Sequence, residues 1–385
     1  CTDRTMRYMI QPMYMPHCIN VHYAEEFKRA LSVPIVAVGS ITTMEEAEEI
    51  IASGKADMVA MARAIMAGED TVVNAQRGKT EDTRPCLRCW TCNKHSGMGV
   101  PVRCAVNPKL GKEPMIARIP EKADAQLIAI VGGGPAGMQT ALSAAERGCK
   151  SVIFERDGEL GGKLILAAGV EYKQDIRRYL NWLKAQVEKN DLIEVRLNTE
   201  ATKEALEELS PDSVVIAAGA EPIIPKVEGA EDNNVIWFGD VDTGNASVGN
   251  KVVLIGGGPS GAETALQLAR EGKKVTLVDR NSASAVIPRW VKCLDAELLD
   301  NGVDFRFNST LAHVDKEGAV IIDSKWREEK IDADTIILSL GFKPNAATAE
   351  NLRVDGVETH VIGDCRRVNS VMQAVHDGFN VASIL

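Results

Sequence analysis

Short runs of apolar residues alternate along the chain with amphipathic stretches, and this alternation predicts the elements of the fold. Near the start of the chain it predicts helices over residues 23–31 and 43–52 and strands over 34–39 and 56–63. Fully apolar strands between helices are typical of parallel β/α units, whose sheet is covered on both faces. Two such units are too few to close a barrel. Residues 1–20 carry four methionines and show no clean period.

Gly39 and the pair Ala62-Arg63 stand at the carboxyl ends of the two predicted strands. In a (β/α)8 barrel the last two loops commonly bind a phosphate there through backbone N–H groups. Arg63 would add a charge-assisted hydrogen bond to such a phosphate. Arg63 could equally cap or solvate the start of a helix, and the spacing alone does not separate these two interpretations.

A stronger pattern begins at residue 127. It predicts a strand over 127–131, an amphipathic helix to about residue 147 and a second strand over 151–155. Between the first strand and the helix stands the motif G-x-G-x-x-G, at Gly132, Gly134 and Gly137. Glu155 ends the second strand eighteen residues after the last glycine. The glycines allow a pyrophosphate to approach the start of the helix, and the acid accepts hydrogen bonds from a ribose, so this segment is predicted to bind a dinucleotide.

The same pattern occurs a second time, with strands over 252–255 and 275–279. The glycines are Gly256, Gly258 and Gly261, and Asp279 again follows the third glycine by eighteen residues. The sequence therefore predicts two dinucleotide sites. A carboxylate at the ribose position favours NADH, because it would repel a 2′-phosphate, whereas the neighbouring Arg280 keeps NADPH as the alternative.

Three further strands are predicted over 214–220, 336–341 and 361–364. For Gly219 and Gly341 a strand followed by a turn is a sufficient interpretation. Asp364 differs, because a carboxylate at a strand end beside the helix predicted over 371–382 can hydrogen-bond a ribityl chain. Since it lies after the second glycine motif, the second dinucleotide domain is predicted to be inserted into the first.

Four cysteines lie close together between the two kinds of pattern, at Cys86, Cys89, Cys92 and Cys104. Three thiols within seven residues and a fourth soon after can converge on one inorganic core, which is typical of an iron–sulfur cluster. A four-thiolate zinc site is the alternative, but zinc ribbons usually present their ligands as two separated pairs.

Composition narrows the classes of protein. A length of 385 residues allows two or three domains, and no apolar run is long enough for a membrane span. The net charge of −10 argues against nucleic acid as a partner. Nine cysteines without a secretory signal indicate the reducing cytoplasm. Most of the scattered cysteines are interpreted as small buried residues, with Cys365 the exception because it follows Gly363-Asp364.

With these residues in hand, the chain resembles the iron–sulfur flavoenzymes related to bacterial 2,4-dienoyl-CoA reductase, 2-enoate reductases and trimethylamine dehydrogenase. The resemblance covers nearly the whole chain, through residues 33–39, Arg84-Pro85-Cys86, 104–108 and Gly363-Asp364 together with the two nested motifs. In such enzymes an Old Yellow Enzyme-like barrel holds FMN and the substrate, a cysteine loop holds one [4Fe–4S] cluster, and the C-terminal half holds FAD and receives NAD(P)H. The resemblance favours the cluster over zinc.

The resemblance also implies roles for individual residues. The FMN phosphate would be held by Gly39, Ala62 and Arg63, and the cluster by Cys86, Cys89, Cys92 and Cys104. The implied FAD contacts are Gly132, Gly134, Ala136, Gly137, Glu155, Arg156, Gly162, Lys163, Ala201 and Asp364. The implied nicotinamide dinucleotide contacts are Gly256, Gly258, Gly261 and Asp279.

The expected fold class is α/β, with the C-terminal remnant of a (β/α)8 barrel, a [4Fe–4S] loop segment and two nested Rossmann-like domains. The expected domains are the FMN barrel remnant over 1–80, the iron–sulfur segment over 81–121, the FAD domain over 122–245 and 340–385, and the NAD(P)H domain over 246–339. A barrel needs roughly 200 residues or more, yet 85 precede Cys86. The expectation is therefore that the chain is a fragment of a longer parent protein. The alternatives are that the rest of the barrel is absent from the structure or is supplied by another chain. The residues that bind substrate and donate a proton would lie in the missing part.

The resulting hypothesis is an NAD(P)H-dependent reductase of a C=C bond conjugated to a carbonyl, with electrons passing from NADH through FAD, [4Fe–4S] and FMN to a small unsaturated carbonyl substrate. One alternative is an amine dehydrogenase like trimethylamine dehydrogenase, against which the intact Gly258, Gly261 and Asp279 speak. Another is an NADH-oxidising electron-transfer module. Disulfide reduction by the usual C-x-x-C is excluded, because residues 246–339 contain only Cys293. A membrane partner is not expected, and a homo-oligomer is left open.

Overall fold

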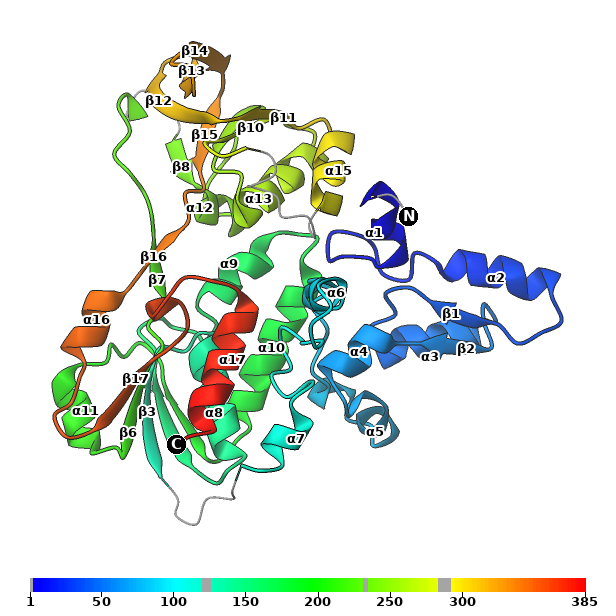
Figure 1. Cartoon of the computed structure of the whole chain (residues 1–385), viewed down its shortest axis with the longest axis vertical. Helices are drawn as coiled ribbons and strands as arrows, with labels where there is room; N and C mark the ends of the chain where they lie inside the picture. The colour runs from blue at the N-terminus through cyan, green and yellow to red at the C-terminus, as the bar shows by residue number, and fades with distance from the viewer. Residues whose placement is uncertain (1–2, 120–125, 231–234, 283–291) are drawn as a thin grey trace. The chain divides into compact units, whose positions relative to one another are not determined.

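The structure is a computed structural model that describes residues 3–119, 126–230, 235–282 and 292–385 (Figure 1). The chain forms two compact units. The larger unit comprises residues 8–165, 174–220 and 344–385, and the smaller unit comprises residues 1–7, 166–173 and 221–343. The domain boundary predicted near residue 122 lies outside the described residues.

A parallel five-stranded sheet in the order β17-β6-β3-β4-β5 organises the larger unit. Its strands are β3 (Leu127–Val131), β4 (Lys150–Phe154), β5 (Ile193–Arg196), β6 (Ser213–Ile216) and β17 (Glu358–Val361). The central strands β3 and β6 are almost wholly apolar and buried, as a parallel sheet between two helical layers requires.

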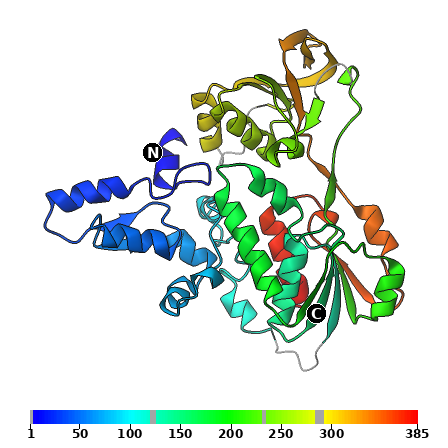
Figure 2. The same ribbon diagram turned by 180° about the vertical axis from the view of Figure 1, so that it is seen from behind.

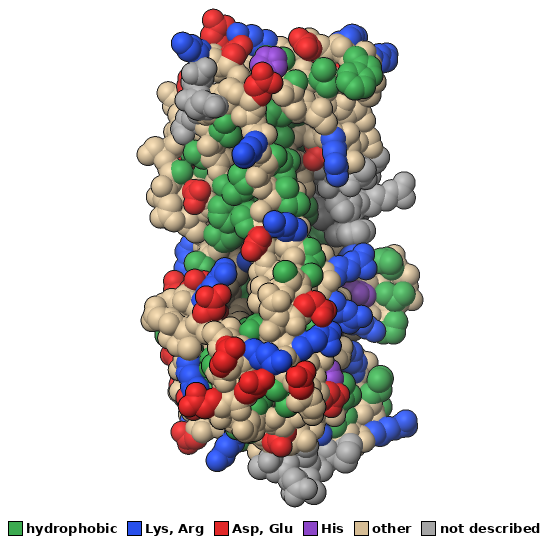
Figure 3. All heavy atoms as spheres, turned by 90° about the vertical axis from the view of Figure 1, so that its left-hand side faces the viewer, with side chains coloured by type: hydrophobic (Ala, Val, Ile, Leu, Met, Phe, Trp, Pro, Cys, Tyr) green, Lys and Arg blue, Asp and Glu red, His purple; other side chains and the backbone are tan. Residues whose placement is uncertain are grey.

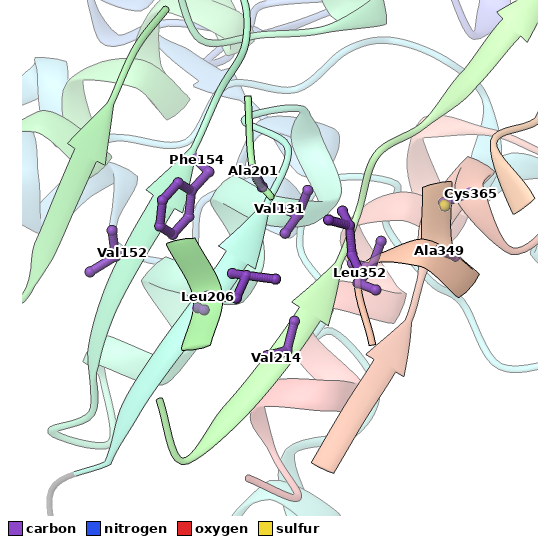
Figure 4. Close-up of a cluster of buried hydrophobic side chains, with 11 residues drawn as sticks. Val131, Val152, Phe154, Ala201, Leu206, Val214, Ala349, Leu352 and Cys365 are labelled. Carbon is purple, nitrogen blue, oxygen red and sulfur yellow. The ribbon is translucent and has the colours of Figure 1, made fainter. Parts of the chain in front are cut away.

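Helices α8 (Pro135–Ala145), α10 (Gln174–Glu188) and α17 (Val371–Ala382) pack together beside this sheet, as Figures 1 and 2 show from opposite sides. A hydrophobic cluster joins the sheet to α11 (Lys203–Leu209) and α16 (Ala346–Asn351). There Leu206 and Leu352 lie with Val131, Phe154 and Val214 (Figure 4). Full burial of each such side chain contributes about 1.5–3 kcal/mol to stability. The helices on one side of the sheet and this cluster together hold the end of β3 from which the first glycine loop emerges.

The N-terminal part of the larger unit contains two parallel β/α units, as predicted. Strands β1 (Val36–Val38) and β2 (Met58–Ala60) pair with Val36 opposite Met58, and α2 (Val21–Ala30) and α3 (Met44–Ala52) cover one face. On the other face Val36, Val38 and Met58 are exposed by 49%, 59% and 49%. This two-stranded sheet therefore presents an apolar face that the described residues leave uncovered.

One expectation for this part was wrong in detail, and one helix lies where none was predicted. The strand predicted over 56–63 ends at Ala60, and Ala62 begins the helix α4 (Ala62–Ala67), because Ala64 and Ala67 bury one side of a segment rich in strong helix formers. Helix α1 (Asp3–Met9) lies in the stretch that showed no clean period.

The smaller unit is built on a second five-stranded parallel sheet, in the order β11-β10-β9-β15-β8. Its strands are β8 (Val235–Trp237), β9 (Lys251–Ile255), β10 (Lys274–Asp279), β11 (Asp304–Phe307) and β15 (Thr335–Leu338). Helices α12 (Phe238–Asp242), α13 (Pro259–Arg270) and α15 (Lys292–Asp300) accompany it. An antiparallel sheet of β12 (Ser309–Asp315), β13 (Gly318–Asp323) and β14 (Glu328–Asp332) completes the unit.

The order of the strands confirms the predicted nesting. The chain leaves the first sheet after β6, forms the second sheet, and returns to the first with β17. The short strands β7 (Ala220–Pro222) and β16 (Phe342–Pro344) pair where the chain passes between the units. The remaining elements are α5 (Thr71–Gln76), η1 (Thr80–Asp82), α6 (Thr91–Gly97), α7 (Glu113–Ile116), α9 (Lys163–Gly169) and η4 (Gly363–Cys365).

No helix among the described residues combines the length and the apolar character that a membrane crossing requires. On the face drawn in Figure 3, acidic and basic side chains are interspersed with patches of hydrophobic ones.

Candidate functional site

The four predicted cysteines lie together on an irregular part of the larger unit. Cys86 and Cys89 precede α6, Cys92 lies in its first turn, and Cys104 follows it. Two residues of the loop adopt left-handed backbone, Arg88 with a φ of 49° and Trp90 with a φ of 62°. Such a conformation costs a non-glycine residue roughly 1–2 kcal/mol. The strained turns allow cysteines that are three residues apart to face one pocket.

This pocket contains about 320 Å³ of space, including the part that is open to solvent. All four cysteines line it, together with Arg63, Met66, Leu87, Arg88, Trp90, Thr91, Ala105 and Val106. In the part of the chain that the structure describes, no three His, Cys, Asp or Glu side chains are grouped so that they could hold one metal ion. A single zinc ion would need its four sulfurs at about 2.3 Å, whereas a cluster binds each thiolate to a different iron and lets the sulfurs stand further apart.

The pKa values of these thiols depend on burial and on nearby backbone amides. Burial raises the pKa of Cys86 and of Cys92, and it raises the pKa of Cys104 to about 11. Backbone amides oppose this effect: Arg88 N donates to Cys86 Sγ at 3.3 Å, and Val106 and Asn107 donate to Cys104. As thiolates, Cys86 and Cys104 would accept these N–H groups and would still need a cation to balance their charge. Four thiols on one pocket with these donors therefore fit an iron–sulfur cluster.

The residues predicted for a flavin mononucleotide phosphate surround the carboxyl ends of β1 and β2. Gly39 has a φ of 131°, and a Cβ there would lie 2.9 Å from the Asn20 side chain. Ala62 is exposed at the start of α4. Arg63 donates to Gln11 O at 2.7 Å and to Ser40 Oγ at 2.9 Å, and it also lines the cysteine pocket. Arg63 thus stands between the two predicted sites.

The first glycine loop has the geometry that a pyrophosphate requires. Gly132 has a φ of 104°, and a Cβ on Gly137 would lie 2.0 Å from Gly132 O. Nothing lies within 4 Å of the place where a Cβ of Gly134 would be, so this side of the loop is open. The buried carboxylate of Glu155 accepts from Gly133 N at 2.7 Å and from Asp157 N at 2.9 Å. The structure brings these residues together at one end of β3 and β4.

Most other residues predicted for FAD lie near this loop or belong to the elements that pack beneath it. A Cβ on Gly162, which has a φ of 50°, would lie 3.2 Å from Gly134 Cα. Lys163 Nζ ion-pairs with Asp364 Oδ2 at 3.2 Å, and burial lowers the pKa of Lys163 while Asp364 opposes that effect. Ala136 is buried in α8, Arg156 is exposed, and Ala201 belongs to the hydrophobic cluster of Figure 4.

The second glycine loop, in the smaller unit, repeats the geometry of the first. Gly256 has a φ of 107°, and a Cβ on Gly261 would lie 2.0 Å from Gly256 O. Asp279 accepts from Gly257 N at 2.7 Å, and its other oxygen accepts from Asn281 N at 2.7 Å. A Cβ on Gly258 would again meet nothing within 4 Å. Arg280, next to Asp279, is exposed.

Two ionic groups were not predicted from the sequence. In the smaller unit Lys173 ion-pairs with Glu263, and Asp242 accepts from Thr264 Oγ1 at 2.9 Å. Burial raises the pKa of Asp242 to about 7. In the larger unit Arg88, inside the cysteine loop, is 1% exposed and pairs with the buried Asp175. An arginine within a cysteine motif is a weak signal, and Asp175 offers none.

Two known protein families match this chain. Residues 126–378 match the family described as pyridine nucleotide-disulphide oxidoreductase. Residues 12–82 match the NADH:flavin oxidoreductase / NADH oxidase family.

Individual relatives agree with both matches. The NADH oxidase of Thermoanaerobacter brockii is 33% identical over 98% of this chain and 59% of its own length. The cinnamate reductase of Clostridium sporogenes is 32% identical over 96% of this chain and 56% of its own length. A solved complex of 2-naphthoyl-CoA reductase with 2-naphthoyl-CoA superposes with a TM-score of 0.89 at 28% identity, over 97% of this chain and 57% of that one. The chain therefore spans a little more than half the length of these relatives.

Proposed function

Because the chain belongs to the pyridine nucleotide-disulphide oxidoreductase family, we propose that it carries electrons from NADH towards a flavin that reduces a C=C bond conjugated to a carbonyl. The expected kinship with the iron–sulfur flavoenzymes related to 2,4-dienoyl-CoA reductase is confirmed by both family matches and by the relatives named above. The matches also support FAD, NADH and FMN as cofactors. The cluster, the site residues and the substrate are our proposals.

The observation that carries the proposal is the convergence of four cysteines on one pocket in a chain that also folds two glycine loops. Cys86, Cys89, Cys92 and Cys104 would hold a [4Fe–4S] cluster. Such a cluster, when bound, supplies one-electron transfer between two flavins that need not touch, whereas hydride transfer needs near contact. Leu87, Trp90 and Val106 shield one side of the pocket from water.

The two glycine loops would divide the nucleotides between them. In the larger unit the N–H groups at the start of α8 would bind the FAD pyrophosphate, Glu155 would accept from the ribose, and Asp364 would face the ribityl chain. In the smaller unit Gly258 would let the NADH pyrophosphate approach the start of α13. Asp279 would accept from its ribose and disfavour NADPH.

Gly39, Ala62 and Arg63 would hold the phosphate of FMN, and β1 and β2 would be part of its barrel. The proposed domains follow the same division: a barrel part over 1–80, a cluster segment over 81–121, an FAD domain over 122–245 and 340–385, and an NADH domain over 246–339. The proposed substrate is a small unsaturated carbonyl compound, because related chains include a reductase of cinnamate and one of 2-naphthoyl-CoA. Seven of the described cysteines are free thiols, which supports a reducing cytoplasm: Cys18, Cys86, Cys89, Cys92, Cys104, Cys149 and Cys365.

Anaerobic titration tests the proposal. We expect that NADH added to the chain reconstituted with FAD, iron and sulfide first bleaches the flavin absorption and then produces the electron paramagnetic resonance (EPR) signal of a reduced cluster. Cys89→Ala should lose that signal and keep the bleaching. The matched control Cys149→Ala, a buried cysteine in the nucleotide domain, should keep both. A chain that binds zinc through these cysteines and shows no paramagnetic cluster would overturn the proposal.

A further inference from the structure

Arg88 lies in the middle of the cysteine motif, yet its side chain points away from water and into the larger unit. Its guanidinium donates from Nη1 to Met15 O at 2.8 Å, from Nη2 to Met13 O at 3.3 Å and from Nε to Asp175 Oδ2 at 2.7 Å. A second residue of the loop, Trp90, donates to Ile10 O at 2.7 Å. The cysteine loop is therefore held on residues 10–16 by two of its own side chains.

Asp175 contacts three basic side chains through its carboxylate. It lies in the first turn of α10 and its side chain is fully buried. Besides Arg88 it contacts His17 Nε2 at 3.0 Å and Arg178 Nη1 at 3.3 Å. Burial opposes ionisation here, but the bonds from His17 and Arg88 hold the pKa of Asp175 below its ordinary value. Asp175 is therefore an anion whose stability depends on its cationic neighbours.

His17 connects Asp175 to a second carboxylate. Its Nδ1 lies 2.6 Å from Glu46 Oε1, and Glu46 also accepts from the backbone of Thr42 and Thr43 in the capping box of α3. Burial lowers the pKa of His17, but the two carboxylates outweigh it and raise that pKa above its ordinary value. Nδ1 is thus hydrogen-bonded to Glu46, whereas Nε2 lies beside Asp175 without hydrogen-bond geometry. A carboxylate beside each nitrogen favours the protonated ring.

We propose that Arg88 positions the cysteine loop and that the charge on His17, transmitted through Asp175, makes reduction of the cluster depend on a proton. This inference rests on the proposed function, because it requires a cluster on the four cysteines. One electron from a reduced flavin adds a negative charge to the pocket. The His17 ring takes up one proton from the solvent, and its positive charge compensates the added electron. The charged groups that face His17 are Asp175 from α10, Glu46 from α3 and Arg88 from the loop, and Arg178 contacts the same Asp175.

The direction of the effect follows from the charges. When His17 loses its proton, its two carboxylates lose a neighbouring positive charge, and only Arg88 and Arg178 balance Asp175. The surroundings of the pocket then become more negative, and an added electron is less stable there. The reduction potential of the cluster should therefore fall as the pH rises through the pKa of His17.

The test is an EPR-monitored redox titration of the reconstituted chain from pH 6 to pH 9, with dithionite as the reductant. We expect the midpoint of the wild-type cluster to fall with pH. His17→Gln should have a lower midpoint at pH 6 and no pH dependence. His22→Gln, on the exposed side of α2, is the matched control and should behave as wild type. Glu46→Gln, which removes one carboxylate but keeps the shape, should move the transition to lower pH.

Arg88→Lys separates position from charge. It keeps the cation but loses the forked contact with Asp175 and the two carbonyls, so we expect a broadened EPR signal with retained iron. A wild-type chain without any cluster signal would overturn the proposed function. A normal cluster whose midpoint is the same at all pH values, or a His17→Gln chain that keeps the wild-type slope, would overturn this inference alone. If His17→Gln does not fold, Glu46→Gln decides between the two outcomes.

Discussion

The two glycine loops of this chain share the conformation of their first glycine and the hydrogen bond to their acid, but they differ in the charged groups around them. The first glycine has a φ of 104° in one loop and 107° in the other, and each acid accepts a loop N–H at 2.7 Å. Beside the first loop lies the partly exposed pair Lys163–Asp364, whereas α13 after the second loop adjoins the half-buried Asp242 and the pair Lys173–Glu263. The shared part follows from the turn itself, and the part that differs comes from residues distant in sequence.

The largest expected effects come from the glycines that close each turn. A Cβ on Gly137 or on Gly261 would lie 2.0 Å from a backbone oxygen, which no flexible side chain can relieve. Gly137→Ala should therefore abolish FAD binding, and Gly261→Ala should abolish NADH binding while FAD stays bound. Calorimetric titration of each nucleotide measures this, and equal loss of both nucleotides in either variant would contradict separate sites.

Gly258→Ala is the companion variant for this experiment. A Cβ there meets nothing within 4 Å, and the backbone of Gly258, with a φ of −58°, suits any residue. The folded loop should survive, with an unchanged melting temperature, and only the bound pyrophosphate would meet the new methyl group. We expect at least tenfold weaker NADH binding, which is about 1.4 kcal/mol. Unchanged affinity would mean that the nucleotide does not approach this loop.

The half-buried Asp242 beside the second loop should make the stability of the folded chain depend on pH. The folded pKa of Asp242, about 7, exceeds its ordinary value of 3.8, so the folded chain binds the proton more tightly than the unfolded chain does. Stability is then lost as the pH rises from about 4 to 7, by roughly 2–4 kcal/mol. Asp242→Asn imitates the protonated acid, so it should raise the melting temperature at pH 8 and leave it nearly unchanged at pH 4. An equal change at both values would show that ionisation is not the cause.

This contrast explains how much of the molecule the sequence predicts. The strands, helices and acids of both loops were predicted because a strand, three glycines and a terminal acid are spaced by local backbone geometry. The convergence of the four cysteines was predicted for the same reason, since short spacing limits where the chain can place them. The boundaries of β2 and α4 were missed, because burial of Ala64 and Ala67 decides them.

The ionic groups could not be predicted in the same way. Arg88 and Asp175 are 87 residues apart, and only the packing of the cysteine loop against α10 brings them together. Arg63 was predicted for a phosphate, and its place on the wall of the cysteine pocket follows from the position of α4 against the loop. Polar side chains can serve a distant partner or water equally well, so their spacing in the sequence says little about which one they meet.

A smaller effect should appear in the choice between NADH and NADPH. Asp279 would repel a 2′-phosphate, and the exposed Arg280 beside it would attract one. Asp279→Asn should shift the ratio of NADPH to NADH affinity by about tenfold, or about 1.4 kcal/mol, measured by calorimetry. Glu155→Gln in the first loop serves as the matched control and should leave that ratio unchanged. A shifted ratio in Glu155→Gln would mean that the two loops do not separate the nucleotides.

The smallest expected effect concerns the ion pair beside the first loop. Lys163 and Asp364 lie 3.2 Å apart, and their side chains are 29% and 23% exposed, so water screens them in part. Lys163→Met should cost less than about 1 kcal/mol in urea unfolding, and the coupling in a double-mutant cycle with Asp364→Asn should be of that size or smaller. FAD affinity should fall about threefold, because the flavin is proposed to lie beside both groups. A change in stability without a change in FAD affinity would show that the pair only links α9 to η4, and the two loops would then differ less in function than in structure.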